Sequence, residues 1–402
     1  MNKIVLSALA ALTLGTLSAS AGNLKLYTDD SGQVFTKPGE GRTEVISKET
    51  PVFSKADKLK FSGTTYIGYT YNDYKKDSST VSYESDDSNF ELRRAYFQLK
   101  AYLLDDPKSY YRVTFDMHQN SESDMVVRAK YAYLYLNNIL PLTGVEIGLA
   151  HRPWHDYEEH NAWLYRNISK VLIEAKNGGD LSNSADFGVN FKTKTKYFDS
   201  EIGLFNGEGY HSDFNDDETG SAQTAMSLEW RATAHLLGVK GKDKQTSKTY
   251  FDASFFGQYN PNHKDSGDGI TGNYDDLVFV GLHTVYNQPK FLVSAQYVTS
   301  LDTADESTYV SAQAGSGYSI NGEYRLGEDK EYRALVRYDS WTDKKLVSST
   351  EKADNAYIIG AAWDQSHNVQ WVANAIITDN EKGSDREKYN SVAYMLTAEV
   401  KF

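Results

Sequence analysis

The chain contains no cysteine and, beyond its amino-terminal segment, no long apolar run. The absence of cysteine excludes a disulfide framework. A transmembrane helix needs about 20 consecutive apolar residues, and no later stretch approaches that length, so helical membrane spans are excluded. Only 40% of the residues are hydrophobic, and the mean hydropathy is −0.57. These values fit either a soluble protein or a membrane protein built from strands with one polar face.

The amino-terminal segment carries the features of an export signal. Lys3 supplies a positive charge, residues 4–17 form an apolar run, and Ala19-Ser20-Ala21 is an Ala-x-Ala cleavage site. The run is too short to anchor the chain in a bilayer. We therefore expect residues 1–21 to be a cleaved signal peptide, with Gly22 as the first residue of the exported protein.

The carboxy-terminal segment, residues 394–402, alternates strictly between two kinds of side chain. One face carries Tyr394, Leu396, Ala398, Val400 and Phe402, and the other carries Met395, Thr397, Glu399 and Lys401. A strand that is apolar on one side, polar on the other and closed by an aromatic residue is typical of the end of an outer-membrane β-barrel. Phe402 is therefore predicted to be an assembly signal that the barrel-assembly machinery reads.

The same alternation recurs from about residue 57 onward, in about sixteen segments. Long acidic or Gly-rich links, such as 72–89 and 153–184, alternate along the chain with short links such as 327–330. Barrels in outer membranes follow this rule, with short periplasmic turns and long extracellular loops. The predicted fold is therefore all-β, a transmembrane antiparallel β-barrel of about sixteen strands over residues 57–402. Residues 22–56 are rich in turn formers and are predicted to be a periplasmic lead-in segment.

Tyrosine and proline are distributed as a barrel requires. The 30 tyrosines suit the aromatic girdles at the two membrane interfaces, although a tyrosine-rich soluble β-sandwich is an alternative. All seven prolines, Pro261 among them, lie outside the segments that alternate. Proline cannot donate to a strand ladder, and a closed barrel has no edge strand to hold it. Four apolar segments are ambiguous in phase: 128–136, 198–206, 277–286 and 356–363.

Five short motifs occur in order along the chain. They are Leu92-Arg93-Arg94-Ala95-Tyr96, Gly148-Leu149-Ala150-His151-Arg152-Pro153, Leu204-Phe205-Asn206-Gly207, Gly317-Tyr318-Ser319-Ile320-Asn321-Gly322 and Val336-Arg337-Tyr338-Asp339. With these motifs, residues 57–402 resemble the phosphate-selective porin O and P family. The resemblance implies a sixteen-stranded trimeric barrel with one loop folded into the lumen. The family's basic ladder and lysine cluster do not map onto this chain, so phosphate selectivity is not implied.

The link over residues 153–184 is the candidate lumen constriction loop. A dense polar cluster opens it at 153–160, and Leu164, Ile168, Val171, Leu172 and Ala175 then recur at helical spacing. We expect an amphipathic turn that ends near Gly178 and packs on the inner wall of the barrel. The alternatives are a loop standing in solvent over the rim, or a further strand.

Inward-facing charges and the polar cluster of this loop make up the predicted pore lining. The set comprises Arg94, Lys100, Arg112, Asp116, Arg152, His155, Glu158, Glu159, Arg231, Arg333, Arg337 and Asp339. His151, His155, His160, Glu158 and Glu159 are suitable residue types for a metal, but their spacing matches no zinc signature. No metal and no cofactor are therefore predicted. No Ser-His-Asp grouping stands out either, so no catalytic residues and no enzymatic activity are predicted.

The net charge of −13 is placed mainly in the long loops, because inward basic and acidic residues nearly cancel. Such a surface makes nucleic acid an improbable partner. The predicted function is a porin of the Gram-negative outer membrane, through which small hydrophilic solutes and ions diffuse passively. The protein is predicted to contact outer-membrane lipid and lipopolysaccharide and to assemble as a homotrimer. The alternative is a surface adhesin or structural barrel whose long loops bind a partner.

Overall fold

The computed structural model describes residues 27–29, 34–35, 37–44, 58–75, 82, 84–102, 106–119, 124–207, 209–210, 226–237, 245–263, 275–300, 315–343, 352–382 and 387–402. The chain divides into two compact units, one up to Asp57 and one from Lys58 to Phe402. The expected signal peptide, residues 1–21, lies outside the described residues. No helix of the described residues is long and apolar enough to cross a membrane.

The first unit contains a small antiparallel sheet of three short strands. These are β1 (Tyr27–Asp29), β2 (Val34–Phe35) and β3 (Arg42–Glu44), in the order β2-β1-β3. The guanidinium of Arg42 lies over the ring of Phe35, 3.5 Å from its centroid. The predicted lead-in segment therefore includes regular secondary structure, which its turn-rich sequence did not indicate.

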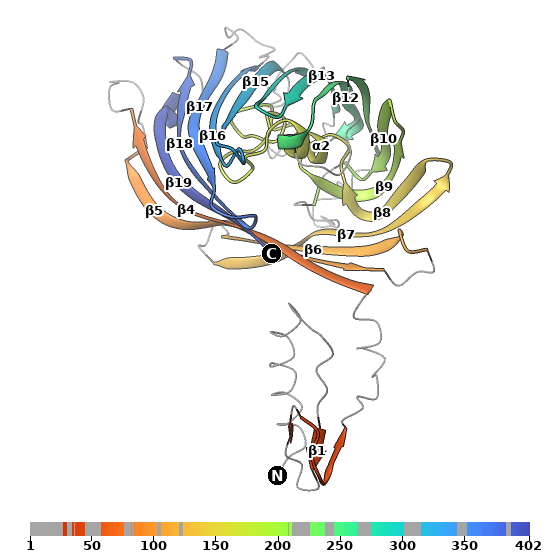
Figure 1. Ribbon diagram of the computed structural model, residues 1–402. Helices are drawn as coiled ribbons and strands as arrows, with labels where there is room; N and C mark the ends of the chain where they lie inside the picture. The colour runs from red at the N-terminus through yellow and green to blue at the C-terminus, as the bar shows by residue number, and fades with distance from the viewer. Residues whose placement is uncertain are drawn as a thin grey trace. The chain divides into compact units, whose positions relative to one another are not determined.

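The second unit is a closed antiparallel barrel of sixteen strands (Figure 1). Each strand pairs with its neighbours in sequence, and β19 closes the barrel by pairing with β4. The strands are β4 (Leu59–Tyr74), β5 (Asp87–Ala101), β6 (Tyr110–Gln119), β7 (Met125–Leu140), β8 (Thr143–His151), β9 (Ala185–Lys194), β10 (Phe198–Phe205), β11 (Ser227–Leu237), β12 (Tyr250–His263), β13 (Asp275–Gln288), β14 (Phe291–Ser300), β15 (Gly315–Leu326), β16 (Tyr332–Asp343), β17 (Lys352–Asp364), β18 (Val369–Asn380) and β19 (Ser391–Lys401). The predicted fold class is confirmed.

The links between strands follow the predicted long and short alternation with two exceptions. The link 289–290 between β13 and β14 is short, and the next link, 301–314, is long. The link 120–124 is short where a long one was expected, and 238–249 is long where a short one was expected.

Alternation along each strand separates an exposed apolar face from a polar inner face. On β6, Thr114 is 3% exposed whereas the adjacent Phe115 is 42% exposed on the outside. Successive residues of a strand point to opposite faces. When every second residue is apolar and faces outward, the residues between them face the interior of the barrel. The barrel wall therefore presents a hydrophobic exterior and a polar interior, as an outer-membrane barrel does.

Register shifts interrupt this alternation at several places, two of them in β5 and β7. Tyr66 pairs with Arg94 and Ile67 with Leu92, so Arg93 is an extra residue in β5. Thr114 pairs with Tyr131 and Phe115 with Ala129, so Lys130 is an extra residue in β7. A bulge shifts the phase of a strand by one residue. The segment 128–136 has no constant phase for this reason: Arg128 faces inward before the bulge, and Tyr131 and Tyr133 face inward after it.

Strand β12 corrects one prediction about proline. Pro261 lies inside β12, so the prediction that all seven prolines lie outside strands is wrong for this residue. The register between β12 and β13 shifts between Asn260 and His263. Proline is tolerated within a sheet at such irregularities, because no ladder hydrogen bond is required of its nitrogen there.

The seam of the barrel is completed by the last residue. The backbone nitrogen of Phe402 donates to the carbonyl oxygen of Gly63 at 3.1 Å, and Gly63 N donates to Phe402 O at 3.0 Å. The ring of Phe402 lies where a Cβ atom on Gly63 would project. The terminal aromatic residue therefore covers a glycine on the outer face of β4.

Candidate functional site

The segment that joins β8 to β9, residues 152–184, lies inside the barrel against its inner wall. It begins with a short helix, α2 (His155–Asn161), which Figure 1 shows within the curve of the strands. The ring of Trp154 stacks on that of Phe256 of β12, with centroids 3.7 Å apart and planes 3° from parallel. One buried apolar cluster joins the loop to β12, β13, β14 and β16–β19: Trp154, Tyr157, Trp163, Tyr165, Ile168, Val171, Leu172, Ile173, Leu181, Phe256, Leu277, Phe279, Val298, Leu335, Trp341, Ile358, Ala362, Val372 and Met395.

This cluster explains a second ambiguous segment. Leu277 and Phe279 of β13 face inward and are buried beneath the loop. Val278 and Leu282 face outward on the same strand, so β13 is apolar on both sides. Periodicity alone cannot give a phase to such a strand.

Polar contacts hold the loop to strands around the wall. Tyr157 Oη donates to Asp252 of β12 at 2.9 Å. Asn167 Nδ2 donates to Thr397 Oγ1 of β19 at 3.2 Å, and Arg93, the bulge residue of β5, donates to the carbonyl oxygen of Ile168 at 3.3 Å. The loop is thus tied to both sides of the lumen.

The helical part of the loop differs from the prediction. Regular helix forms over 155–161, whereas the residues at helical spacing, from Leu164 to Ala175, lie in and between two short turns, 166–168 and 172–174. Ala175 N donates to Val171 O at 2.9 Å and Gly178 N to Ala175 O at 2.9 Å. The expected packing on the inner wall is present, because Ile168, Val171 and Leu172 are all buried. The solvent-exposed loop and the additional strand are both contradicted.

Five residues predicted to line the pore are instead buried between loop and wall, because the loop covers the wall where they lie. They are Arg152, His155, Glu158, Arg231 and Arg337. Arg152 Nε donates to both carboxylate oxygens of Glu229 at 2.9 Å. Arg231 donates to Pro153 O at 3.0 Å, and the guanidinium of Arg337 lies over the ring of Trp163, 4.6 Å from its centroid. These side chains anchor the loop and do not face open lumen.

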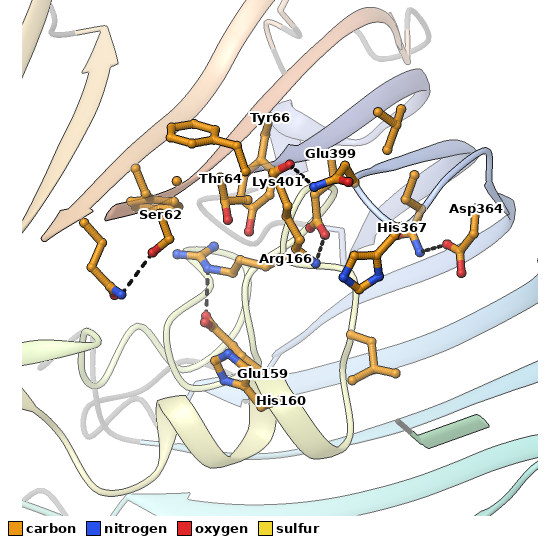
Figure 2. A pocket seen from close by; sticks show the side chains of 18 of the residues that line it. Ser62, Thr64, Tyr66, Glu159, His160, Arg166, Asp364, His367, Glu399 and Lys401 are labelled. Carbon is orange, nitrogen blue, oxygen red and sulfur yellow. Dashed lines mark hydrogen bonds and ion pairs between the residues drawn. The ribbon is translucent and has the colours of Figure 1, made fainter. Parts of the chain in front are cut away.

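Glu158 is the clearest of these corrections. It is 1% exposed, and it accepts a hydrogen bond from Trp154 Nε1 at 2.7 Å and another from Gln296 of β14. Burial raises the pKa of Glu158 to about 7, although the nearby Arg337 acts in the opposite direction. The adjacent Glu159 has the other orientation and faces the interior of the barrel (Figure 2).

Four further predicted residues point inward, and three of them are paired within the wall. Asp116 is fully buried and lies 2.7 Å from Arg94 and 3.3 Å from Arg128. Asp339 pairs with Arg337 at 2.8 Å. Lys100 lies over the ring of Tyr110, 4.6 Å from its centroid.

An open cavity of about 1020 Å³ remains between the loop and the opposite wall (Figure 2). It is bounded by β4–β8, by α2 and the loop, and by the ends of β16–β19. Of the predicted residues, Arg112, Glu159 and Arg333 line it. The predicted pore lining did not include other charged residues that line the cavity, among them Lys130, Asp156, His160, Arg166 and Asp364. Glu399 and Lys401, which alternation placed on the polar face of the last strand, line it as well.

Several charges of this cavity are neutralised by close partners. Arg166 contacts Glu159 at 2.7 Å and Glu174 at 3.0 Å, as Figure 2 shows for the first of these pairs. Arg333 pairs with Asp364, and Lys401 pairs with Glu399.

Arg112 and Lys130 on the wall, like Asp156 on the loop, line the cavity without a carboxylate, lysine or arginine of the described residues as an ion-pair partner. Arg112 donates to Thr114 Oγ1 at 3.0 Å and to Tyr133 Oη at 3.3 Å, and lies over the ring of Tyr131. Lys130 is 5% exposed and lies 4.7 Å from the centroid of the Tyr96 ring. Within the described ranges, no carboxylate lies within 4 Å of either cation.

The side chain of Asp156 is 41% exposed. Its neighbours are imidazoles: His160 Nδ1 at 3.4 Å and His151 Nε2 at 3.8 Å from Oδ1. No lysine or arginine of the described ranges lies within 4 Å of it. The residues considered as metal ligands are split, because His155 and Glu158 face the wall. No group of three or more His, Asp or Glu side chains in the described part of the chain is arranged to hold a metal ion.

Helix α2 divides its residues between wall and cavity at helical spacing. Trp154, Tyr157, Glu158 and Asn161 are buried, whereas Asp156, Glu159 and His160 face the cavity. Residues three and four apart share one face of a helix. A helical interpretation of residues 154–161 would therefore have identified Asp156 and separated Glu159 from Glu158.

No protein-family model and no curated protein sequence matches this chain. Among solved structures, the anion-selective porin from Comamonas acidovorans is similar with a TM-score of 0.59 at 12% identity, over 86% of this chain and 99% of the porin. Salmonella typhi OmpF, in complex with daunomycin, has a TM-score of 0.59 at 10% identity, over 86% and 97% of the two chains. The trimer form of OmpT, an outer membrane protein of Vibrio cholerae, has a TM-score of 0.54 at 12% identity, over 86% and 99%. The chain shares the barrel fold of these bacterial outer-membrane proteins.

Proposed function

We propose that this protein is a porin of the Gram-negative outer membrane, through which small hydrophilic solutes and ions diffuse passively. The observation that carries the proposal is the cavity of about 1020 Å³ that remains when the loop folds into the barrel. The loop packs through its apolar cluster on β12–β14 and β16–β19 and leaves the charged residues of β6 and β7 open to the cavity. A polar lumen inside an apolar barrel surface is the arrangement of a water-filled channel.

The loop narrows this channel and sets its charge. Arg112 and Lys130 lie on the β6–β7 wall, and Asp156 and Glu159 lie on the loop, so both signs of charge line one passage. In a narrow space with a low effective dielectric, such charges act more strongly than charges on the outer loops. The passage therefore excludes large solutes sterically and favours solutes that carry charge or a dipole.

The exported chain, after loss of residues 1–21, assembles in this proposal as a homotrimer among lipid and lipopolysaccharide. Residues 22–56 lead from the signal peptide to the barrel on the periplasmic side. Phe402 acts as the signal for the barrel-assembly machinery, which its exposed ring beside Gly63 supports. The short motifs that resemble phosphate-selective porins support a porin, and the proposal does not extend to phosphate as the solute.

Conductance of the purified protein in planar bilayers tests the proposal. The expected result is stepwise, ohmic current increments in KCl that require the folded, heat-modifiable form. A folded protein that inserts into bilayers and produces no current contradicts it.

A further inference from the structure

The cavity holds a cation and a carboxylate that lie close together without pairing. Arg112 Nη1 lies 3.2 Å from His151 Nε2, and Asp156 Oδ1 lies 3.8 Å from the same nitrogen. The two charged atoms are therefore at most 7.0 Å apart, the sum of these distances. Both residues line the cavity.

His151 does not neutralise either group. A guanidinium only donates hydrogen bonds, so Nε2 of His151 must accept from Arg112. Nδ1 then carries the proton and donates to Glu146 Oε2 at 3.1 Å. A neutral ring in this tautomer presents a lone pair to Arg112 and offers no proton to Asp156. The imidazole thus holds Arg112 in place and leaves the carboxylate of Asp156 directed at the cavity.

A second cation reinforces the positive side. Lys130 lies 5.5 Å from the centroid of the Tyr131 ring, and Arg112 lies 4.7 Å from that same centroid. The bulge in β7 is what turns Lys130 inward, and bulges often re-aim a side chain at a functional site. A buried, unpaired ammonium is costly unless a ligand compensates it. The positive side is therefore suited to an oxyanion, and Asp156 is suited to an ammonium group.

We propose that this passage selects small zwitterions, namely α-amino acids and short peptides. The solute carboxylate pairs with Arg112 and Lys130, and the solute ammonium pairs with Asp156. This inference rests on the proposed function, since it assigns a solute class to the same channel. An anion without an ammonium group is attracted by Arg112 and Lys130 on the wall but repelled by Asp156 and Glu159 on the loop. For a cation without a carboxylate the attraction and the repulsion are reversed, so neither solute gains the net attraction that a zwitterion does.

Solute flux into liposomes that contain the protein tests this assignment. The probes are four molecules of equal size: glycine, the neutral glycolamide, the cation glycinamide and the anion glycolate. At low solute concentration we expect glycine to enter about threefold faster than each of the other three, the ratio that one partly exposed ion pair supplies. Glycolate or glycinamide entering as fast as glycine overturns the proposal, and so does equal flux for all four.

Variants assign the two ends of the site. Asp156→Asn should abolish the advantage of glycine over glycolate, and Asp156→Glu should keep it. Arg112→Gln should abolish the advantage of glycine over glycinamide. Asp379→Asn, which removes half of an exposed ion pair with Lys75, is the matched control and should keep both advantages. An advantage that survives in Asp156→Asn overturns the site.

Conductance separates this inference from the proposed function. A protein that conducts KCl but shows no preference for glycine refutes the zwitterion site and leaves the channel intact. A protein that conducts no KCl refutes the channel itself.

Discussion

Replacing Trp154 with alanine should loosen the loop and enlarge the channel. Trp154 is 3% exposed, stacks on Phe256 and donates a hydrogen bond to Glu158, so it contacts both the wall and the helix of the loop. Truncating a buried tryptophan costs about 3–5 kcal/mol. At about 4 kcal/mol the ratio of docked to undocked loop falls roughly 10³-fold. Because the barrel ladder does not depend on this contact, the strands should remain paired.

Single-channel recording and liposome swelling measure this effect. We expect Trp154→Ala to show larger and noisier current steps than the unchanged protein, and to admit larger sugars. Trp371→Ala is the matched control, because Trp371 is 38% exposed on the outer face and should not alter conductance. A Trp154→Ala protein with unchanged conductance and unchanged heat-modifiable mobility would refute the idea that this loop sets the size of the channel.

Three further experiments test the wall, the seam and the buried carboxyl. Phe115→Arg should reduce the heat-modifiable folded form, at a cost of about 2–4 kcal/mol on the lipid-facing side, whereas Thr114→Arg on the inner face should be tolerated; equal tolerance on gels would contradict the assigned faces. Gly63→Ala should displace the ring of Phe402 and lower membrane-inserted barrel without reducing export, measured by fractionation, and normal insertion would show that the contact is dispensable. Burial raises the pKa of Glu158 to about 7 from an ordinary value near 4.5. The Glu158 carboxyl therefore holds its proton more tightly when the loop is docked, and the docked loop loses stability as pH rises from about 4.5 to about 7. Thermal unfolding should therefore show Glu158→Gln gaining stability relative to the unchanged protein between pH 5 and pH 8, and a pH-independent difference would contradict the raised pKa.

The wall of the barrel was predictable because every strand needs an apolar outer face and a polar inner face. Phe115 meets lipid and Thr114 meets the lumen in the proposed membrane setting, and period-two alternation records this in the sequence. The exceptions have local causes. The bulge at Lys130 reverses the phase of β7, and a single sequence gives no signal for an inserted residue beyond the loss of a regular pattern.

The site was less predictable, because it depends on which part of the wall the loop covers. Arg231 and Arg337 face inward as alternation requires, yet the loop buries both of them. That outcome is a tertiary contact between residues far apart in sequence, and alternation within one strand carries no information about it. Glu158 and Glu159 differ for a simpler reason: neighbouring residues of a helix point in different directions, and in α2 (155–161) Glu158 points to the wall and Glu159 to the cavity.

Cysteine accessibility tests most directly whether solutes pass between the loop and the β4–β8 wall. The chain has no cysteine, so a single one can be introduced without background. Glu159→Cys should react with a charged methanethiosulfonate reagent, and the reaction should lower the current through channels that are already open. Glu158→Cys, one residue away and 1% exposed in the parent side chain, should neither react nor change the current. Block at position 158 with none at position 159 would contradict this account of the channel.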